Sequence, residues 1–302
     1  MLRILLPSPA QGATTRGCQC APATSEEATD LLGRYDGGAK VLAGGIDLIA
    51  KMRRWQIEPR CLVSIRRIPG LGGFAVNESG ELSIGPMVSL RALELSPQVR
   101  EGWPVLHHSI TQIASVQVKT MGTVIGNLCV ATPASDVAVA LYVLDARLTL
   151  TGSEGQRTLP IEEFFVPVAA SVLQLDEIVT ELVVPPMPPA TGAAFQKLAH
   201  TKACIAKVNA AALVTLKDDR CSRVRIALGA VGPTFIRARR AEDLLEGASP
   251  TPERINEAAE AAASESQPQD DLRSSADYRR RMVKVLTARA LSAALDSARK
   301  EG

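Results

Sequence analysis

Helical and strand-like apolar patterns alternate in the first sixty residues. Apolar side chains recur at helical spacing over residues 24–34, where Ser25 is the expected N-terminal cap. A short apolar run at 41–42 indicates a buried strand, and the glycine pair 44–45 indicates a turn. Helical spacing resumes from Asp47. The pattern predicts a strand–glycine turn–helix unit.

The next stretch of the chain mixes the same two periods. Strands are expected within 61–71 and 81–90, and a helix over 105–118. A second helix is expected from Ser135, a favourable capping residue, to about residue 145. Residues 147–159 read as two short strands around a turn.

A proline-rich stretch at 182–192 separates this part from the rest and is the expected domain boundary. Residues 207–232 predict a β-hairpin that turns at 218–220. Helical spacing covers 252–266 and 275–300, so this part combines an antiparallel sheet with helices.

Composition excludes several classes of partner. The chain has 302 residues, 46% of them hydrophobic, a net charge of +2 and only 3% aromatic residues, which argues against a nucleic-acid surface. No apolar run approaches the length of a membrane span. The N-terminal segment 1–12 lacks the apolar core of a signal peptide, so we expect a cytoplasmic protein.

Six cysteines are scattered along the chain, and only Cys18 and Cys20 are close together. No group of four has the spacing of an iron–sulfur or structural zinc site. A metal contact or oxidation at this pair is conceivable, but two free thiols in a polar segment is the favoured interpretation. The pattern fits a reducing compartment.

Two glycine turns carry the strongest hint of a ligand. Residues 42–48 contain one and residues 122–127 the other. Glycines allow backbone N–H groups to approach an oxyanion, and a helix N-terminus favours negative charge. Thr123, Asn127 and Thr132 add neutral hydrogen-bonding groups. Together the turns predict a diphosphate or dinucleotide site, although neither matches the P-loop or the three-glycine dinucleotide motif.

Catalytic side chains are scarce. Asp136 suits a sugar hydroxyl or a helix cap better than a phosphate. The three histidines, His107, His108 and His200, show no metal-binding spacing, and no Gly-x-Ser-x-Gly motif is present. If the chain belongs to an enzyme, a cofactor performs the chemistry.

Several segments, in order, resemble the FAD-binding medium subunit of the molybdenum hydroxylase family, which includes carbon monoxide dehydrogenase and xanthine dehydrogenase. They are "KVLAGGIDLIAKM", "VKTMGTVIGNLCVATPASDVAVALYVLDARLTL", "DEIVTELVVP", "FQKL" and "DDLRSSADYRRRMVKVLTARAL". The likeness extends over nearly the whole chain.

The resemblance implies an α+β fold. An FAD-binding domain of the vanillyl-alcohol-oxidase type would occupy residues 1–184, as subdomains of about 1–60 and 61–184. A C-terminal flavoprotein domain of an antiparallel sheet with helices would occupy residues 190–302.

The resemblance also assigns roles around FAD. The first turn would wrap the diphosphate and adjoining atoms, and the second would continue that grip and line the nucleotide side. Val179 would pack near the flavin ring, or be plain core; Lys197 would lie near the ring's polar edge, or be a surface lysine. The implied cofactor-binding residues are Leu42, Ala43, Gly44, Gly45, Ile46, Asp47, Leu48, Ile84, Gly85, Thr123, Gly126, Asn127, Cys129, Thr132, Asp136, Val179 and Lys197.

One departure from the family pattern bears on flavin binding. Ile125 stands where the family usually has a glycine before Asn127. A side chain there disfavours a positive φ, so we expect a negative φ at Ile125 with FAD still bound. Lys119 stands where an arginine is common, and residues 199–209 lack the usual arginines, which bears on the chemistry with the external acceptor.

The function implied is electron transfer. Electrons from a molybdenum centre would pass through [2Fe–2S] clusters to FAD and then to an external acceptor. Because this chain lacks clustered cysteines, an iron–sulfur small subunit and a molybdopterin large subunit are expected partners, in a heterotrimer or a dimer of heterotrimers. The alternatives are a self-sufficient flavin oxidoreductase of vanillyl-alcohol-oxidase type and a scaffold subunit with a degenerate flavin site.

Overall fold

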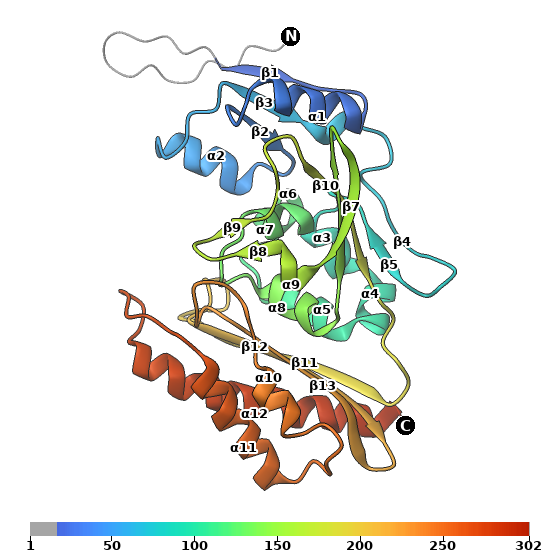
Figure 1. Ribbon diagram of the computed structural model, residues 1–302, viewed down its shortest axis with the longest axis vertical. Coiled ribbons are helices and arrows are strands. Elements are labelled where there is room, and N and C mark those ends of the chain that lie inside the picture. Colours follow the sequence, from blue (N-terminus) through green and yellow to red (C-terminus); the bar gives the residue numbers. More distant parts are fainter. Residues whose placement is uncertain (1–16, 302) are drawn as a thin grey trace.

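A computed structural model describes residues 17–301 of the chain in three tiers (Figure 1). A small parallel sheet with its helices forms one end, and a mixed region of helices and strands forms the middle. An antiparallel sheet covered by helices forms the other end. The α+β architecture expected from the sequence is confirmed. The N-terminal segment 1–12, considered above for a signal peptide, lies outside the described residues.

The first tier contains the predicted strand–glycine turn–helix unit. Its parallel strands run in the order β1-β3-β2. The helix predicted over 24–34 is present, but its cap is Thr24, not Ser25, because the Thr24 hydroxyl accepts the Glu27 N–H. The elements are β1 (Cys18–Cys20), α1 (Ser25–Arg34), β2 (Ala39–Leu42), α2 (Ile46–Arg53), β3 (Cys61–Ser64) and η1 (Ile65–Arg67).

The first sheet extends past residue 60, because β3 pairs with both β1 and β2. Each strand has only three or four residues, and β3 is buried throughout. Side chains of α1 pack on the sheet, with Ala28 and Leu32 in the same apolar cluster as Val63.

The middle tier holds a five-stranded sheet and a two-stranded ribbon. The larger sheet has the order β4-β5-β10-β6-β7 and is antiparallel, and β8 pairs with β9. The two short strands predicted in 147–159 are present as neighbours in this sheet. The strands are β4 (Phe74–Val76), β5 (Leu82–Ile84), β6 (Arg147–Gly152), β7 (Gly155–Pro160), β8 (Phe165–Val166), β9 (Ala170–Ser171) and β10 (Ile178–Val184).

Short helices cover this sheet. The single helix predicted over 105–118 is wrong: two helices occupy the region, and Ala114 between them has φ 38°. The helix predicted from Ser135 is confirmed, with the Ser135 hydroxyl as its cap, and every residue from 136 to 143 is buried. The helices are α3 (Leu90–Leu95), α4 (Pro97–Gly102), α5 (Pro104–Thr111), α6 (Val116–Met121), α7 (Val124–Cys129), α8 (Asp136–Val143) and α9 (Ile161–Phe164).

The third tier is an antiparallel sheet in the order β11-β12-β13-β14. The predicted hairpin is confirmed, and its turn residues Asp218 and Asp219 have φ of 50° and 56°, as a type I′ turn requires. Residues 185–190 connect β10 to this tier. The strands are β11 (Thr191–Leu198), β12 (Val208–Lys217), β13 (Arg220–Gly229) and β14 (Ile236–Arg237).

Helices α10 (Arg239–Asp243) and α12 (Ala276–Glu301) pack on this sheet, and α11 (Pro252–Glu265) packs on both of them. From the middle tier, α5 and α8 also contact the sheet. The helix predicted over 275–300 is present as α12, in which Leu286, Leu291 and Leu295 are buried and Tyr278 is exposed. Among the described residues, no helix is both long enough and apolar enough to cross a membrane.

Candidate functional site

The two glycine turns touch each other through their backbones. Gly44 lies so close to the second turn that a Cβ on it would stand 2.2 Å from the Met121 carbonyl oxygen and 3.1 Å from the Gly122 Cα. Gly45 has φ 80° and caps α2 from the left-handed region. Glycine is therefore required at both positions, for the approach at 44 and for the conformation at 45.

Arg66 donates two hydrogen bonds to the first turn. Its Nε donates to the Ala43 carbonyl at 2.9 Å, and its Nη2 donates to the Gly44 carbonyl at 3.3 Å. These bonds occupy carbonyls of the turn and place a guanidinium beside it. Sequence reasoning missed this residue, because it lies more than twenty positions from the turn and only the sheet brings η1 next to the end of β2.

The second turn begins α7 and is fixed from several sides. The Thr123 hydroxyl accepts the Gly126 N–H at 3.0 Å, and a Cβ on Gly126 would stand 2.6 Å from that hydroxyl. The Leu90 N–H donates to the Gly122 carbonyl at 2.9 Å, which ties the turn to α3. The Thr123 side chain therefore caps α7 and holds the second turn in place.

Asn127 is oriented by Ser135. The Ser135 hydroxyl already accepts the Ala138 N–H, so its own proton points to Asn127 Oδ1, at 2.5 Å. This bond fixes the amide and leaves its NH₂ group for another acceptor. Asn127 lies within α7 and does not have a positive φ.

One cavity of about 560 Å³ lies against both turns. Its volume falls within the range of small-molecule and cofactor sites. Most of the residues assigned to FAD from the sequence share its wall: Ala43, Gly44, Gly45, Ile46, Asp47, Leu48, Thr123, Gly126, Asn127, Cys129 and Val179. Segments 80 residues apart in sequence therefore meet at one site, as the sequence predicts.

Other predicted residues lie outside this wall. Leu42 packs with Met52 and Leu62 in a small apolar cluster, and Ile84 is completely buried in the main core. A Cβ on Gly85 would stand 2.4 Å from the Leu71 carbonyl, so that glycine serves a close backbone approach. For these residues and for Thr132, contact with the cofactor stays a prediction.

Asp136 and Lys197 form a buried ion pair. Their side chains are each only 6% exposed, and Lys197 Nζ lies 2.6 Å from Asp136 Oδ2. Lys197 also donates to the Gln112 carbonyl, and Asn209 donates to Asp136 Oδ1. Burial raises the pKa of Asp136, and the charge and hydrogen bond of Lys197 partly offset this effect.

This ion pair joins α8 in the middle tier to β11 in the C-terminal tier. The interpretation of Lys197 as a surface lysine is wrong. Neither residue is in the cavity wall, so their predicted contacts with the cofactor stay predictions.

Ile125 has the backbone conformation expected for it. It lies within α7, and its φ is not positive, which confirms the prediction of a negative φ. The side chain is 3% exposed and packs in the main core while also bordering the cavity. Accommodating a Cβ here requires no strain in the turn.

Sequence reasoning missed a third wall of the cavity. It runs from Ser171 at the end of β9 through Leu173 and Leu175 to the start of β10, where only Val179 was predicted. Two lysines, Lys40 and Lys51, also border the cavity, so it is less poor in cations than the second turn alone suggests. None of the three histidines is among the lining residues.

The residues present fit a diphosphate-containing cofactor. Backbone of both glycine turns lines one cavity, and a Cβ at Gly44 would collide with the Met121 carbonyl next to the second turn. The oriented Asn127 amide offers donors. Apolar side chains such as Ile113 and Val179 line other parts of the wall. This mixture of anion-binding backbone and apolar surface suits a dinucleotide with an aromatic ring system.

Comparisons with known families agree with this geometry. The family described as "FAD binding domain in molybdopterin dehydrogenase" matches residues 15–187. The family described as "CO dehydrogenase flavoprotein C-terminal domain" matches residues 193–294.

Individual relatives match over almost their full lengths. The chain is 34% identical to the carbon monoxide dehydrogenase medium chain of Hydrogenophaga pseudoflava, covering 91% of this chain and 95% of that one. It is 33% identical to the 6-hydroxypseudooxynicotine dehydrogenase complex subunit alpha of Paenarthrobacter nicotinovorans, covering 91% and 93%.

Solved structures give the same result. A chain of carbon monoxide dehydrogenase from Hydrogenophaga pseudoflava superposes with a TM-score of 0.90 at 34% identity, covering 93% of this chain and 98% of that one. A chain of quinoline 2-oxidoreductase from Pseudomonas putida 86 gives 0.87 at 29% identity, covering 93% and 97%. The chain belongs to the family of FAD-binding medium subunits of molybdenum hydroxylases, and it is an FAD-dependent subunit of an oxidoreductase.

Proposed function

We propose that the cavity between the two glycine turns holds FAD with its diphosphate at their junction. The observation that carries the proposal is the close backbone approach of Gly44 to Met121 and Gly122, with Gly44 and Gly122 both in the wall of one cavity. Backbone N–H groups at the start of α2, with the Asn127 amide, supply donors to the phosphate oxygens. Lys40, Lys51 and Arg66 add positive charge around the turns.

The remaining walls suit the two ends of the cofactor. Val179 and the apolar residues of the segment leading into β10 offer a surface for the flavin ring. Cys129 and Val130, after the second turn, border the nucleotide side. The bound flavin supplies one- and two-electron chemistry, while the protein excludes water, orients the ring and neutralises the phosphates.

We propose further that the chain relays electrons within a complex. An iron–sulfur small subunit and a molybdopterin large subunit deliver electrons, and an external acceptor removes them. The complex is a cytoplasmic heterotrimer or a dimer of heterotrimers. Relatives named "medium chain" and "FAD-binding subunit" support this division of work, as does the absence of four clustered cysteines among the described residues.

Co-purification tests whether the chain belongs to the proposed complex. A tagged chain expressed in its native host should recover two further chains, with molybdenum, iron and FAD in a fixed ratio. A complex that contains neither molybdenum nor iron would contradict the proposal. Turnover of a substrate by this chain alone would favour the self-sufficient oxidoreductase, and a purified chain with no visible flavin absorbance would favour the scaffold subunit.

A further inference from the structure

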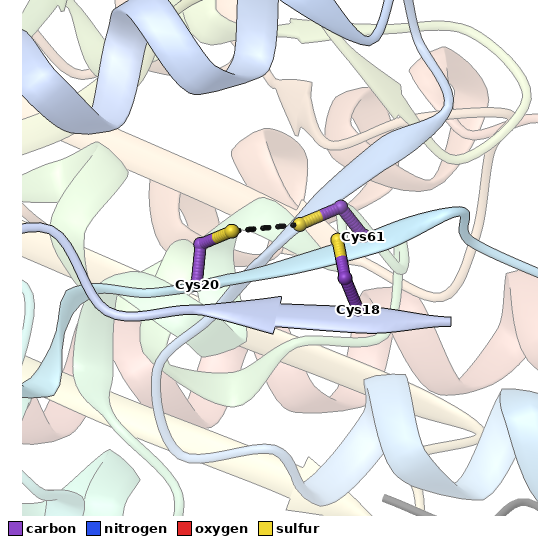
Figure 2. A group of neighbouring side chains, drawn as sticks. All are labelled: Cys18, Cys20 and Cys61. Carbon is purple, nitrogen blue, oxygen red and sulfur yellow. Dashed lines mark hydrogen bonds between the residues drawn. The ribbon is translucent and has the colours of Figure 1, made fainter. Parts of the chain in front are cut away.

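Three cysteine thiols meet at the edge of the first sheet. Cys18 and Cys20 are on β1 and point to the same face, because side chains two apart on a strand do so. Cys61, the first residue of β3, is the register partner of Cys18. Figure 2 shows the three side chains converging between the two strands. The expectation of two free thiols in a polar segment overlooked Cys61, which is 41 residues from Cys20 in sequence.

The distances between these sulfurs are close to those of three thiolates bound to one metal ion. Cys20 Sγ lies 3.5 Å from Cys61 Sγ, and all three sulfurs lie within 4.8 Å of one another. An ion with metal–sulfur bonds of about 2.3 Å at the centre of three thiolates requires sulfurs roughly 4 Å apart. One separation, 3.5 Å, is slightly below that value and none exceeds 4.8 Å, so small side-chain rotations suffice to form the site.

The three cysteines border the apolar cluster of the first tier, yet two of the thiols are partly exposed and a hydroxyl lies beside one of them. Cys61 is fully buried, whereas Cys18 and Cys20 are only partly buried and leave a path for entry. The Tyr35 hydroxyl at the end of α1 lies 3.1 Å from Cys18 Sγ and donates to a thiolate formed there. Arg60 lies over the Tyr35 ring, 5.8 Å from its centroid, and brings positive charge toward a site with three thiolates.

We propose that Cys18, Cys20 and Cys61 bind one Zn²⁺ ion. Thiolates select soft or borderline ions, and zinc accepts three of them with a fourth position left for water or a small ligand. Each thiol gives its proton to solvent as the zinc–sulfur bond forms, so no electron transfer is needed. Residues 1–16 contain no Cys, His, Asp or Glu that would compete for the fourth position.

The bound ion would stabilise β1, the edge strand of the sheet in the first tier. β1 is three residues long and pairs only with β3 in this sheet, so backbone bonds alone hold it weakly. Zinc bridging Cys18 and Cys20 to Cys61 adds bonds between these two strands. None of the three cysteines lines the cavity between the glycine turns, so the zinc site is separate from the proposed flavin site.

Zinc competition on the full-length chain tests the proposal. The chain is reduced, freed of metal anaerobically, and titrated with zinc against a chromophoric chelator. We expect one tight site per chain. Cys18→Ser or Cys20→Ser should weaken it by at least about 100-fold, since loss of even an outer-sphere partner costs about 10–100-fold. Cys204→Ser is the matched control, because Cys204 is also partly buried but lies outside the cluster, and it should bind as the wild type does.

Two further readouts separate lost zinc from lost folding. Zinc should raise the thermal midpoint of the wild type and of Cys204→Ser but not that of Cys20→Ser. Flavin content should be equal in all these variants, so failure of the zinc site and failure of the flavin site are distinguishable. A reduced wild type with no tight zinc site would overturn the proposal. So would a Cys20–Cys61 disulfide that survives treatment with the reductant.

Discussion

Gly44→Ala is the most informative change at the proposed flavin site. The new Cβ would stand 2.2 Å from the Met121 carbonyl oxygen, whereas ordinary van der Waals contact begins near 3.4 Å. The obstructing atom belongs to the backbone, so no side-chain rotation relieves the contact. The two turns must therefore separate by about 1.2 Å, the difference between those distances.

Such a separation exceeds the range of about 0.5 Å over which N–H···O distances vary in hydrogen bonds. Donors from the two turns that converge on one diphosphate cannot all stay within about 3.2 Å of it. A hydrogen bond to a charged group contributes about 1.5–3 kcal/mol. Losing one or two of them weakens FAD binding by about 10-fold at least and about 10⁴-fold at most.

Flavin released from the purified protein, together with an FAD titration of the deflavinated chain, measures this effect. Gly102→Ala is the control, because a Cβ there meets nothing within 4 Å and the residue does not border the cavity. The control should retain wild-type FAD content. A Gly44→Ala protein that is folded and binds FAD as tightly as the wild type would refute the role assigned to the junction of the turns.

Three further variants test the structure around the site. Arg66→Met removes two donors to the first turn and should weaken FAD binding about 10-fold in the same titration. The same substitution at its exposed neighbour, Arg67→Met, should leave FAD binding unchanged. Lys197→Met leaves the Asp136 carboxylate buried and unpaired, so the free energy of unfolding at pH 7 should fall by about 3–5 kcal/mol in denaturant titrations. This loss should shrink as the pH is lowered, because burial raises the pKa of Asp136 and protonation removes its charge; a loss that grows toward low pH would contradict the assignment. Ile125→Ala should cost about 2–5 kcal/mol of stability with FAD retained, and loss of FAD at unchanged stability would show that this side chain serves the flavin directly.

Elements that are marked by residues adjacent in sequence were predicted correctly. The glycine turn of the first tier, the hairpin at Asp218–Asp219 and the cap at Ser135 all depend on residues adjacent in sequence. The two errors in element boundaries arose where neighbouring residues gave no decisive signal. Thr24 and Ser25 are both capping residues, and the sequence alone does not distinguish them. The break at Ala114 has no glycine or proline to mark it.

Contacts between distant segments could not be predicted from local patterns. Arg66 reaches the first turn only because β3 lies beside β2, and Cys61 reaches Cys18 only because β3 also lies beside β1. Lys197 looked like a surface residue because its partner, Asp136, is 61 positions away on another tier. The composition of the two glycine turns predicted a shared site, and the family resemblance assigned that site to FAD; periodicity alone implies neither.

Comparison of FAD with riboflavin tests the central claim most directly. If the junction of the two turns holds the diphosphate, the deflavinated chain should bind one FAD. It should bind riboflavin, which lacks the diphosphate and the adenosine attached to it, at least about 100-fold more weakly, equivalent to roughly 2.8 kcal/mol. Equal affinity for the two flavins would mean that the turns do not grip the diphosphate and would contradict the account.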